Sequence, residues 1–335
     1  MSKLKEECGI FGIFGEDEAA VHTALGLHSL QHRGQEGAGI VSYNGKNFFS
    51  VRKQGLVGDN FNNTETLSQL PGKTAIGHVR YSTTGESKTE NLQPLFANLA
   101  LGGFACAHNG NLTNTISLKK KLVETGSIFQ TSSDTEIILQ LVARSKKEKL
   151  LDKLIDALSQ IKGAYSLIIL TNKKLIGIKD PYGIRPLVLG KKNGSPVLAS
   201  ETCALDMIGA EYVRDINNGE IVVITNDGIE SIKPFKEVNE RPCIFERIYF
   251  ASPDSIVEGK TVYTYRKSLG EQLAIENNIN ADVVVPIPDS GVSAAIGYSQ
   301  KSKIPFELGI IRSHYVGRTF IEPTQNIRQF GVKLK

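Results

Sequence analysis

The stretch Cys8-Gly-Ile-Phe-Gly-Ile-Phe-Gly15 decides which fold the sequence predicts. It is short, apolar and interrupted by glycine, which is typical of a buried β-strand. A cysteine in such a strand is usually a small buried hydrophobic residue. Only seven residues precede Cys8, however, and their removal would leave it as the first residue of the chain. The sequence therefore supports a second interpretation, in which Cys8 is a nucleophile.

An N-terminal cysteine combines a nucleophile and a general base in one residue. Its thiol has an ordinary pKa of about 8.5 and its free α-amine one of about 8, so no histidine is required. A thiolate that attacks an amide also needs hydrogen-bond donors around the oxyanion that forms. Asn109-Gly110, at the end of an expected strand, offers a side-chain amide and a backbone N–H for this purpose.

A free amino acid substrate carries two charges that the protein has to match. Arg80, at the end of an expected strand, is suited to bind an α-carboxylate through two parallel hydrogen bonds. Asp134, in the first turn of an expected helix, is suited to bind an α-ammonium and is favoured there as an anion. Simpler interpretations stay open: Arg80 as a surface ion pair, Asp134 as a capping residue and Asn109-Gly110 as a turn.

The first two thirds of the chain predict a sheet-rich α+β domain with mostly antiparallel strands. Asn44-Gly45 lies between expected strands over 39–43 and 48–53 and is a two-residue hairpin signal. Asn193-Gly194 lies between expected strands over 187–189 and 197–199, which predict a second hairpin. The segment Ser133-Asp134-Thr135-Glu136 predicts a capping box at the start of a helix. Helical patterns cover residues 18–32, 113–123, 133–144 and 150–161.

The pattern changes near residues 233–242, which are polar and contain proline. Beyond them we expect a helix over 263–276, a strand over 282–288, a helix over 292–301 and a strand over 306–311. A strand–helix–strand order is typical of a parallel, doubly wound α/β sheet. One such unit is too small for an independent domain, so we expect the second domain to be incomplete.

The composition excludes several classes of protein. With 40% hydrophobic and 22% charged residues, the chain is that of an ordinary soluble globular protein, and its net charge of +4 over 335 residues gives no reason to expect nucleic acid binding. No segment approaches the roughly 20 apolar residues of a membrane helix, and the N-terminus lacks a secretory signal, so we expect a cytoplasmic protein. The four cysteines are far apart, which favours thiols, ligands or nucleophiles over disulfides.

Five segments of the sequence carry a resemblance to a known family. They are residues 8–15 (CGIFGIFG), 27–40 (LHSLQHRGQEGAGI), 77–82 (GHVRYS), 107–111 (AHNGN) and 131–136 (TSSDTE). In this order they resemble the class II glutamine amidotransferases of the N-terminal-nucleophile family, and five ordered motifs are far more specific than any one. The resemblance implies a four-layer αββα glutaminase domain over residues 8–235 and a propeptide, residues 1–7, that is removed.

The same resemblance assigns roles to individual residues. It implies that Cys8 is the nucleophile, with its own α-amine as the base, and that Asn109 and Gly110 form the oxyanion hole. Arg80 would bind the α-carboxylate of glutamine and Asp134 its α-ammonium. The residues that it places around the glutamine pocket are Arg80, Asp134, Arg33 and Tyr81.

Residues 236–335 are similar to the start of a type I phosphoribosyltransferase domain. The similar segments are 251–255 (ASPDS), 286–291 (PIPDSG) and 315–321 (YVGRTFI), the last matching a mobile loop that closes over the substrate. Ser290 matches a serine associated with the Mg²⁺ that accompanies phosphoribosyl pyrophosphate, although a plain helix cap is an open alternative. Just upstream of the loop, Arg312-Ser313-His314 departs from the family's basic pattern.

Two features set this second half apart from a complete domain. Cys243 matches a cysteine that ligates a 4Fe–4S cluster, which takes four thiolates, and a buried thiol is the alternative. Phosphoribosyltransferases of this type also carry two adjacent acids, and no Asp-Asp pair occurs in the sequence. We therefore expect the phosphoribosyl half to be truncated.

The resemblance implies an enzyme that hydrolyses glutamine and transfers the ammonia to phosphoribosyl pyrophosphate, the first committed step of purine biosynthesis. It also implies a homo-oligomer, either a dimer or a tetramer. Two alternatives stay open: a truncated chain with glutaminase activity only, and a non-catalytic fragment or regulatory subunit. Asparagine and glucosamine phosphate synthases share the glutaminase motifs, but segments 286–291 and 315–321 argue against them.

Overall fold

The structure, a computed structural model, describes residues 8–81, 88–277, 279–313, 329 and 333. The chain divides into two compact units, Met1–Cys243 and Ile244–Lys335. The first unit contains all of the residues that the sequence predicts for glutamine hydrolysis.

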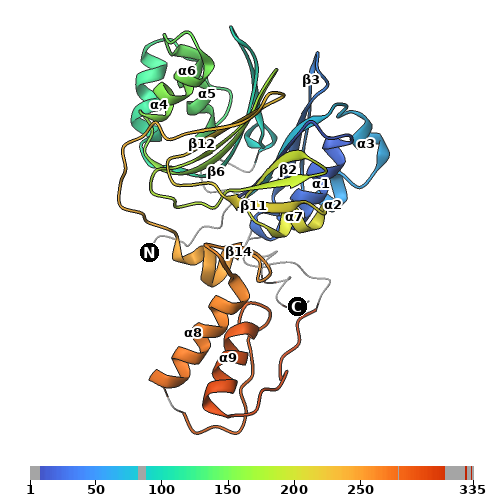
Figure 1. The fold of residues 1–335 in the computed structure, drawn as a ribbon, viewed down its shortest axis with the longest axis vertical. Helices are drawn as coiled ribbons and strands as arrows, with labels where there is room; N and C mark the ends of the chain where they lie inside the picture. Colours follow the sequence, from blue (N-terminus) through green and yellow to red (C-terminus); the bar gives the residue numbers. More distant parts are fainter. Residues whose placement is uncertain (1–7, 82–87, 278, 314–328, 330–332, 334–335) are drawn as a thin grey trace. The chain divides into compact units, whose positions relative to one another are not determined.

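Two antiparallel sheets form the centre of the first unit (Figure 1). The seven strands of sheet A, from edge to edge, are β11 (Glu211–Asp215), β9 (Val188–Lys192), β10 (Ser195–Ala199), β1 (Gly9–Phe14), β4 (Thr74–Arg80), β2 (Gly37–Tyr43) and β3 (Phe48–Gln54). The six strands of sheet B are β13 (Gly228–Ile232), β12 (Ile221–Thr225), β8 (Leu175–Lys179), β7 (Gly163–Thr171), β6 (Gly102–Leu112) and β5 (Leu95–Leu99).

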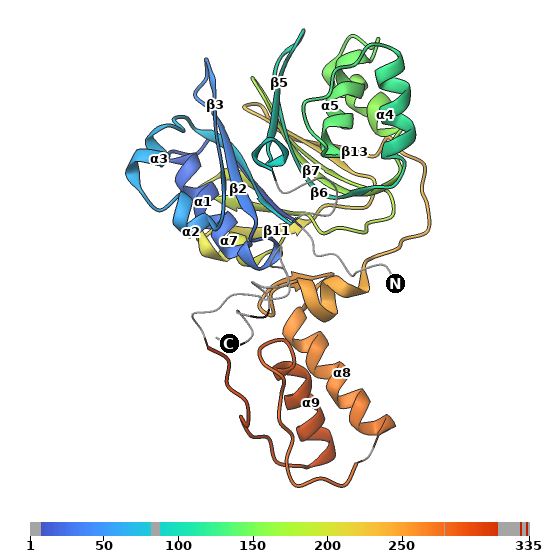
Figure 2. The same cartoon turned by 180° about the vertical axis from the view of Figure 1, so that it is seen from behind.

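Helices cover the outer face of each sheet, so the unit has four layers in the order αββα (Figures 1 and 2). The helices on sheet A are α1 (Ala19–Ser29), α2 (Val57–Asn60), α3 (Thr64–Ser68) and α7 (Cys203–Met207). Those on sheet B are α4 (Thr115–Glu124), α5 (Thr135–Arg144) and α6 (Leu150–Leu158), and two 3₁₀ turns are η1 (Gln31–Arg33) and η2 (Thr89–Asn91). The layer order confirms the four-layer fold that the sequence predicts.

The opening stretch of the sequence forms β1, in the middle of sheet A between β10 and β4. Its side chains alternate, as they must in a strand. Phe11 and Ile13 pack in the cluster under α1, whereas Ile10 packs between the sheets with residues such as Ile168 of β7. Burial on both faces explains why this segment is apolar at nearly every position.

The two predicted hairpins form with different loops. At Asn193-Gly194, Lys192 pairs with Ser195, and both loop residues have positive φ angles, 48° and 94°, so the expected hairpin forms with a two-residue loop and with strands that extend closer to the turn than expected. At Asn44-Gly45, Tyr43 pairs with Phe48 instead, so the loop has four residues and the two-residue prediction was wrong. The reason is the Asn44 side chain, whose Oδ1 accepts hydrogen bonds from the backbone N–H of residues 46 and 47.

The capping box expected at the start of α5 is not formed. The helix begins at Thr135 with Asp134 as its N-cap residue. The carboxylate of Glu136 accepts hydrogen bonds from the backbone N–H of Gln130 and Thr131, at 2.8 and 2.7 Å, instead of returning to Ser133. The loop before the helix therefore takes the acceptor that a capping box would use.

The second unit contains a short π-helix and two longer helices. Its elements are η3 (Glu246–Phe250), β14 (Ile256–Val257), β15 (Lys260–Thr261), α8 (Val262–Glu276) and α9 (Val292–Ser302). The helices confirm those expected near 263–276 and 292–301. The two strands expected around α9 are reduced, in the described residues, to one parallel bridge between Val284 and Phe306. Segment 315–321 lies outside the described residues.

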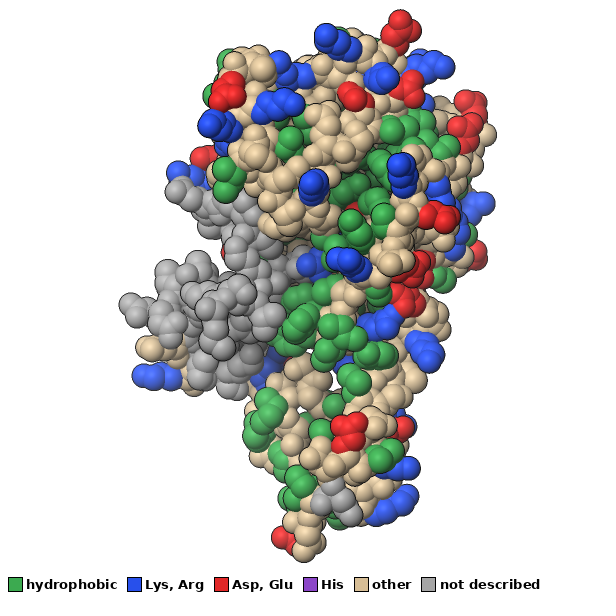
Figure 3. Space-filling view, turned by 90° about the vertical axis from the view of Figure 1, so that its left-hand side faces the viewer, with side chains coloured by type: hydrophobic (Ala, Val, Ile, Leu, Met, Phe, Trp, Pro, Cys, Tyr) green, Lys and Arg blue, Asp and Glu red, His purple; other side chains and the backbone are tan. Residues whose placement is uncertain are grey.

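Apolar side chains are exposed in this second unit, and hydrophobic atoms gather on the face of it drawn in the lower part of Figure 3. Ile287 is 70% and Ile311 is 73% exposed, one in each of the two expected strands. A parallel sheet normally needs cover on both faces.

Across the described ranges, no helix combines the length and hydropathy that a membrane span requires.

Candidate active site

Cys8 lies directly before β1, at the N-terminal end of this central strand of sheet A. Gly9 pairs with Val79, which brings Cys8 to the end of β4, where Arg80 and Tyr81 follow. The Sγ atom lies 3.4 Å from both the backbone nitrogen and the carbonyl oxygen of Tyr81. Cys8 is only 6% exposed, so its thiol sits in a largely enclosed site.

The other three cysteines lie in different surroundings. Cys106 is fully buried in the core beneath sheet B, where burial, together with the charge of Asp134, raises its thiol pKa far above the ordinary value. Cys203 is buried in α7, and Cys243, at the end of the first unit, is half-buried. Burial of this kind makes a thiol inert, so Cys106 is unsuited to be a nucleophile.

Asn109 and Gly110 lie in β6, opposite Ser166 and Tyr165 of β7. The Asn109 side chain is completely buried, and neither its Nδ2 nor its Oδ1 has a hydrogen-bond partner among the described residues. A buried amide without partners costs about 1–3 kcal/mol, so such groups are rare and typically serve a function. Gly110 has φ of +153°, and a Cβ atom there would lie 2.1 Å from the carbonyl oxygen of Ala164.

Asp134 occupies the N-cap position of α5, without a side-chain capping hydrogen bond, and its carboxylate contacts the end of β6. Its Oδ2 accepts a 2.9 Å hydrogen bond from the backbone N–H of Leu112, and its Oδ1 lies 3.7 Å from Nδ1 of His108. Burial raises the pKa of this carboxyl, but His108 and the backbone N–H groups of Leu112 and Thr135 outweigh it and lower the pKa. Asp134 is therefore an anion at neutral pH, as binding of an ammonium group requires.

A pair of histidines joins the two sheets beside the site. Nε2 of His78, in β4, donates a 3.2 Å hydrogen bond to the carbonyl oxygen of His108, in β6. Burial and the charge of Arg80 lower the pKa of His78 to about 3, so the ring is neutral. Both histidines stand in the 77–82 and 107–111 motifs, but sequence reasoning gave neither of them a role.

Arg33 contacts Cys8 directly. It is 2% exposed, and its Nε donates a 3.0 Å hydrogen bond to the carbonyl oxygen of Cys8. Its Nη1 lies 2.5 Å from a carboxylate oxygen of Glu201, a residue that the sequence did not indicate. Arg80 is buried and Tyr81 half-buried at the end of β4. The structure thus joins Cys8, Arg33 and Tyr81 by direct contact.

Ser290, which is expected to meet a metal, belongs to the second unit. Ser290 is exposed in the turn before α9, and Gly291, rather than Ser290, is the N-cap residue of that helix. In the same unit Asp289 forms a 2.8 Å ion pair with Arg312. Within the part of the chain that the structure describes, no three His, Cys, Asp or Glu side chains are grouped so that they could hold a metal ion.

Comparison with known proteins extends over the whole chain. A family model described as a glutamine amidotransferase domain matches residues 78–207. The chain is 58% identical to the amidophosphoribosyltransferase of Rhizobium etli, an alignment that covers 99% of this chain and 68% of that protein. It is 50% identical to the amidophosphoribosyltransferase of Bacillus subtilis, over 99% of this chain and 70% of that protein.

Solved structures give the same picture. The glutamine phosphoribosylpyrophosphate amidotransferase from Bacillus subtilis, complexed with ADP and GMP, superposes with a TM-score of 0.90 at 48% identity. The match covers 98% of this chain and 71% of that chain. Similarity in fold and sequence therefore includes both compact units.

Proposed function

Because the chain belongs to the amidophosphoribosyltransferase family, we propose that it hydrolyses glutamine at Cys8 and transfers the ammonia to phosphoribosyl pyrophosphate. The products are 5-phosphoribosylamine, glutamate and pyrophosphate. Synthases that use other acceptors are not favoured, since relatives at 50–58% identity over 99% of the chain carry the amidophosphoribosyltransferase name.

The observation that carries the proposal is the buried carboxamide of Asn109. Both of its polar atoms lack partners among the described residues, although the side chain is fully buried. An oxyanion formed from a substrate amide would accept the hydrogen bond that Nδ2 is left to donate. Gly110, next in the strand, supplies a backbone N–H whose direction depends on a φ angle that favours glycine.

The chemistry follows from one residue once residues 1–7 are removed. The α-amine of Cys8 takes the thiol proton, and Sγ attacks the side-chain carbonyl carbon of glutamine. The oxyanion is held by Asn109 and Gly110 until the C–N bond breaks, and the amine returns the proton to the leaving ammonia. Water then attacks the glutamyl thioester, releasing glutamate and restoring the thiol.

The glutamine pocket follows from the charges around this centre. Arg80, buried at the end of β4, is proposed to bind the α-carboxylate, and ionised Asp134 the α-ammonium. Tyr81 contacts Sγ of Cys8 through its backbone, and Arg33 contacts the carbonyl oxygen of Cys8. Both are therefore proposed to shape the pocket rather than to react.

The acceptor half and its cofactors are further proposals. We assign residues 236–335 to a phosphoribosyltransferase domain, in which Ser290 would meet the Mg²⁺ that accompanies phosphoribosyl pyrophosphate. Mg²⁺ prefers oxygen ligands and is held largely by phosphate and water, which one exposed hydroxyl fits. Cys243 is proposed as one ligand of a 4Fe–4S cluster, but the described residues contain no group of three or more His, Cys, Asp or Glu side chains that could hold a metal. No step of glutamine hydrolysis passes through either group.

Two measurements test the glutaminase proposal. The intact mass and N-terminal sequence of the purified protein should show that Cys8 is the first residue. Cys8→Ala should abolish glutamate release from glutamine, whereas Cys106→Ala, which removes another buried thiol of the same unit, should reduce stability and leave the activity measurable. Glutamate release that persists in purified Cys8→Ala protein would exclude Cys8 as the nucleophile.

A further inference from the structure

A buried carboxylate stands behind Arg33 and links the nucleophilic residue to a distant part of the chain. Arg33 lies between Cys8 and Glu201: its Nε donates to the Cys8 carbonyl oxygen and its Nη1 bonds to Oε1 of Glu201. The side chains of Arg33 and Glu201 are both 0% exposed. Neither charge reaches solvent, so each depends on the other for its stabilisation.

Glu201 is itself anchored to the strand that follows Cys8. It comes two residues after β10, and its neighbour Ser200 is bonded twice to Ile10 of β1. The Ser200 hydroxyl accepts a 2.9 Å hydrogen bond from the Ile10 N–H, and the Ser200 N–H donates at 3.0 Å to the Ile10 carbonyl oxygen. The carboxylate and the cysteine are thus held by the same piece of β-sheet.

A second cation-capable group shares the carboxylate. Nε2 of His32 lies 2.8 Å from Oε1 of Glu201, and its Nδ1 lies 3.0 Å from the carbonyl oxygen of Ser29. The thiol of Cys203 lies 3.7 Å from Oε2 of the same glutamate. Among the described residues, the charged and titratable groups next to Cys8 or its ion pair are Arg33 and His32 from η1, Glu201 and Cys203 from the β10–α7 junction, and Arg80 and Tyr81 at the end of β4.

We propose that Glu201 is a positioning residue for glutamine hydrolysis: it fixes Arg33, and Arg33 fixes the backbone of Cys8 so that Sγ and the α-amine face the substrate amide. The inference rests on the proposed function. An ion pair with a purely structural role would need no contact with the nucleophilic residue. Arg33, however, donates a hydrogen bond from its Nε–H to the Cys8 carbonyl oxygen. Displacement of reacting groups by about 1 Å can cost on the order of 100-fold in rate.

Two substitutions separate geometry from charge. Glu201→Ala removes the acceptor and frees Arg33, so kcat for glutaminase should fall by at least about tenfold while KM for glutamine stays within about twofold. Glu201→Gln keeps an oxygen acceptor for Arg33 but leaves its charge uncompensated. The positive charge beside Cys8 then favours the thiolate, and the pH dependence of Cys8 reactivity should move to lower pH by about half a unit.

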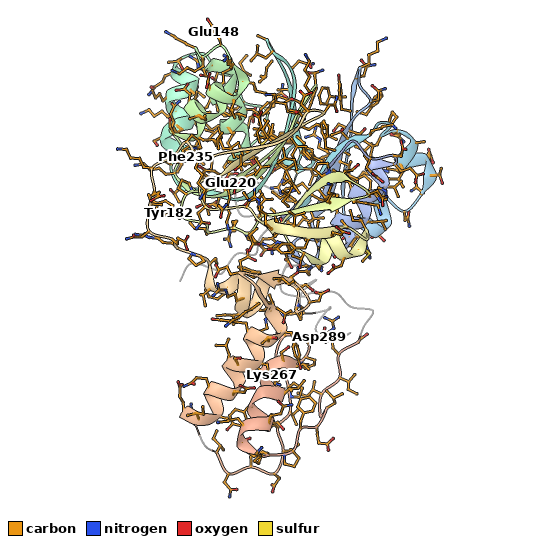
Figure 4. The ribbon with its side chains drawn as sticks, viewed as in Figure 1. Glu148, Tyr182, Glu220, Phe235, Lys267 and Asp289 are labelled. Atoms are coloured by element: carbon orange, nitrogen blue, oxygen red, sulfur yellow. The ribbon has the colours of Figure 1, made fainter. Side chains whose placement is uncertain are left out.

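Glu220→Gln provides the matched control. Glu220, labelled in Figure 4, is also almost fully buried and also paired with an arginine, Arg214, at 2.6 Å. It precedes β12 in sheet B, whereas Cys8 precedes β1 in sheet A. A purely structural role for Glu201 predicts that substitutions of the two glutamates behave alike.

The readout that decides is alkylation of Cys8 by iodoacetamide as a function of pH, followed on the Cys8 peptide by mass spectrometry. We expect a shifted profile for Glu201→Gln and the parent profile for Glu220→Gln. The inference would be overturned if Glu201→Gln and Glu220→Gln had equal alkylation profiles and Glu201→Ala kept the kcat of Glu220→Gln. If the unaltered protein released no glutamate, the proposed function would fail instead, and the alkylation profiles would still decide the role of Glu201.

Discussion

Asp134 accepts a 2.9 Å hydrogen bond from the backbone N–H of Leu112, which stands two residues beyond Gly110 in β6. The first turn of α5 is thereby fastened to the strand that carries the proposed oxyanion donors. The group proposed to bind the ammonium end of glutamine and the groups proposed to act on its amide end are held in one continuous piece of structure. Their spacing does not depend on the substrate.

Asp134→Asn tests the ammonium site. An asparagine oxygen can still accept from Leu112, so the fold should persist, but the negative charge is lost. A hydrogen bond to a charged group is worth about 1.5–3 kcal/mol, so KM for glutamine should rise by roughly 10- to 100-fold in steady-state assays. Asp156→Asn is the control, because the Asp156 carboxylate, in α6, accepts a 2.6 Å hydrogen bond from the Ser145 hydroxyl and takes no part in the proposed site. An unchanged KM in Asp134→Asn would reject the assignment.

Gly110→Ala tests the backbone donor. The new Cβ would meet the Ala164 carbonyl oxygen at 2.1 Å on a residue with φ of +153°. We expect a loss of about 1–3 kcal/mol of stability and a large fall in kcat, because the peptide has to rotate. Gly126→Ala is matched: its φ is +89°, but nothing lies within 4 Å of the added Cβ. The Gly126→Ala variant should lose about 1 kcal/mol of unfolding free energy and keep its activity. Denaturant titrations and glutaminase assays of the two variants measure these effects.

Asn109→Ala should separate stability from activity. Removing one oxyanion donor typically lowers kcat by about 100- to 1,000-fold. Because both polar atoms of the amide lack partners among the described residues, stability should change by less than about 1 kcal/mol.

Asn91→Ala gives the contrast for stability. Its buried amide accepts from the N–H of Ser132 and donates to the Ser132 hydroxyl, both at 2.9 Å. Loss of these bonds should cost about 1–3 kcal/mol. If Asn109→Ala were as destabilised as Asn91→Ala, the Asn109 amide would be structural rather than held ready for substrate.

Glu220 gives the first unit a defined acid sensitivity. Burial raises its pKa, but hydrogen bonds from Arg214, Ser231 and the backbone of Asn217 prevail and lower it from 4.5 to about 2. Since the folded-state pKa is the lower one, the stabilisation is complete above about pH 4.5 and is lost as the pH falls toward 2.

Glu220→Gln should therefore cost about 1–2 kcal/mol at pH 7, a value reduced by the partial exposure of Arg214. The difference from the parent protein should shrink to nothing near pH 2. Urea titrations at several pH values measure it. A difference that stays constant with pH would show that the carboxylate is not ionised in the folded state.

Much of this architecture can be predicted from local features of the sequence. The strand at residues 8–15, the helices and the Asn193-Gly194 hairpin follow from apolar spacing and turn chemistry, which depend on near neighbours. Errors arose where one side chain had two possible partners. Glu136 bonds to the loop at 130–131 instead of completing a capping box, and Asn44 closes a longer loop with its own side chain.

The candidate site was also predicted only in part: its motifs were found, but the distant partners of its residues were not. Motifs pointed to Cys8, Arg80, Asn109 and Asp134, but the groups that hold them were not indicated. Glu201 stands 168 residues from Arg33, and a Glu after an apolar strand carries no local signal of its partner. His78 and His108 stand inside two of the motifs, but their contact is seen only once the two sheets are packed against each other.

The separation of Arg33 from Glu201 also sets an order of events during synthesis. Cys8 is synthesised well before the carboxylate that is proposed to fix Arg33, because Glu201 follows Cys8 by almost 200 residues. The last strand next to β1, β10, arrives at the same late stage. A partly made chain thus carries the proposed nucleophile without the contacts proposed to position it, and we expect no glutamine hydrolysis until most of the first unit can fold.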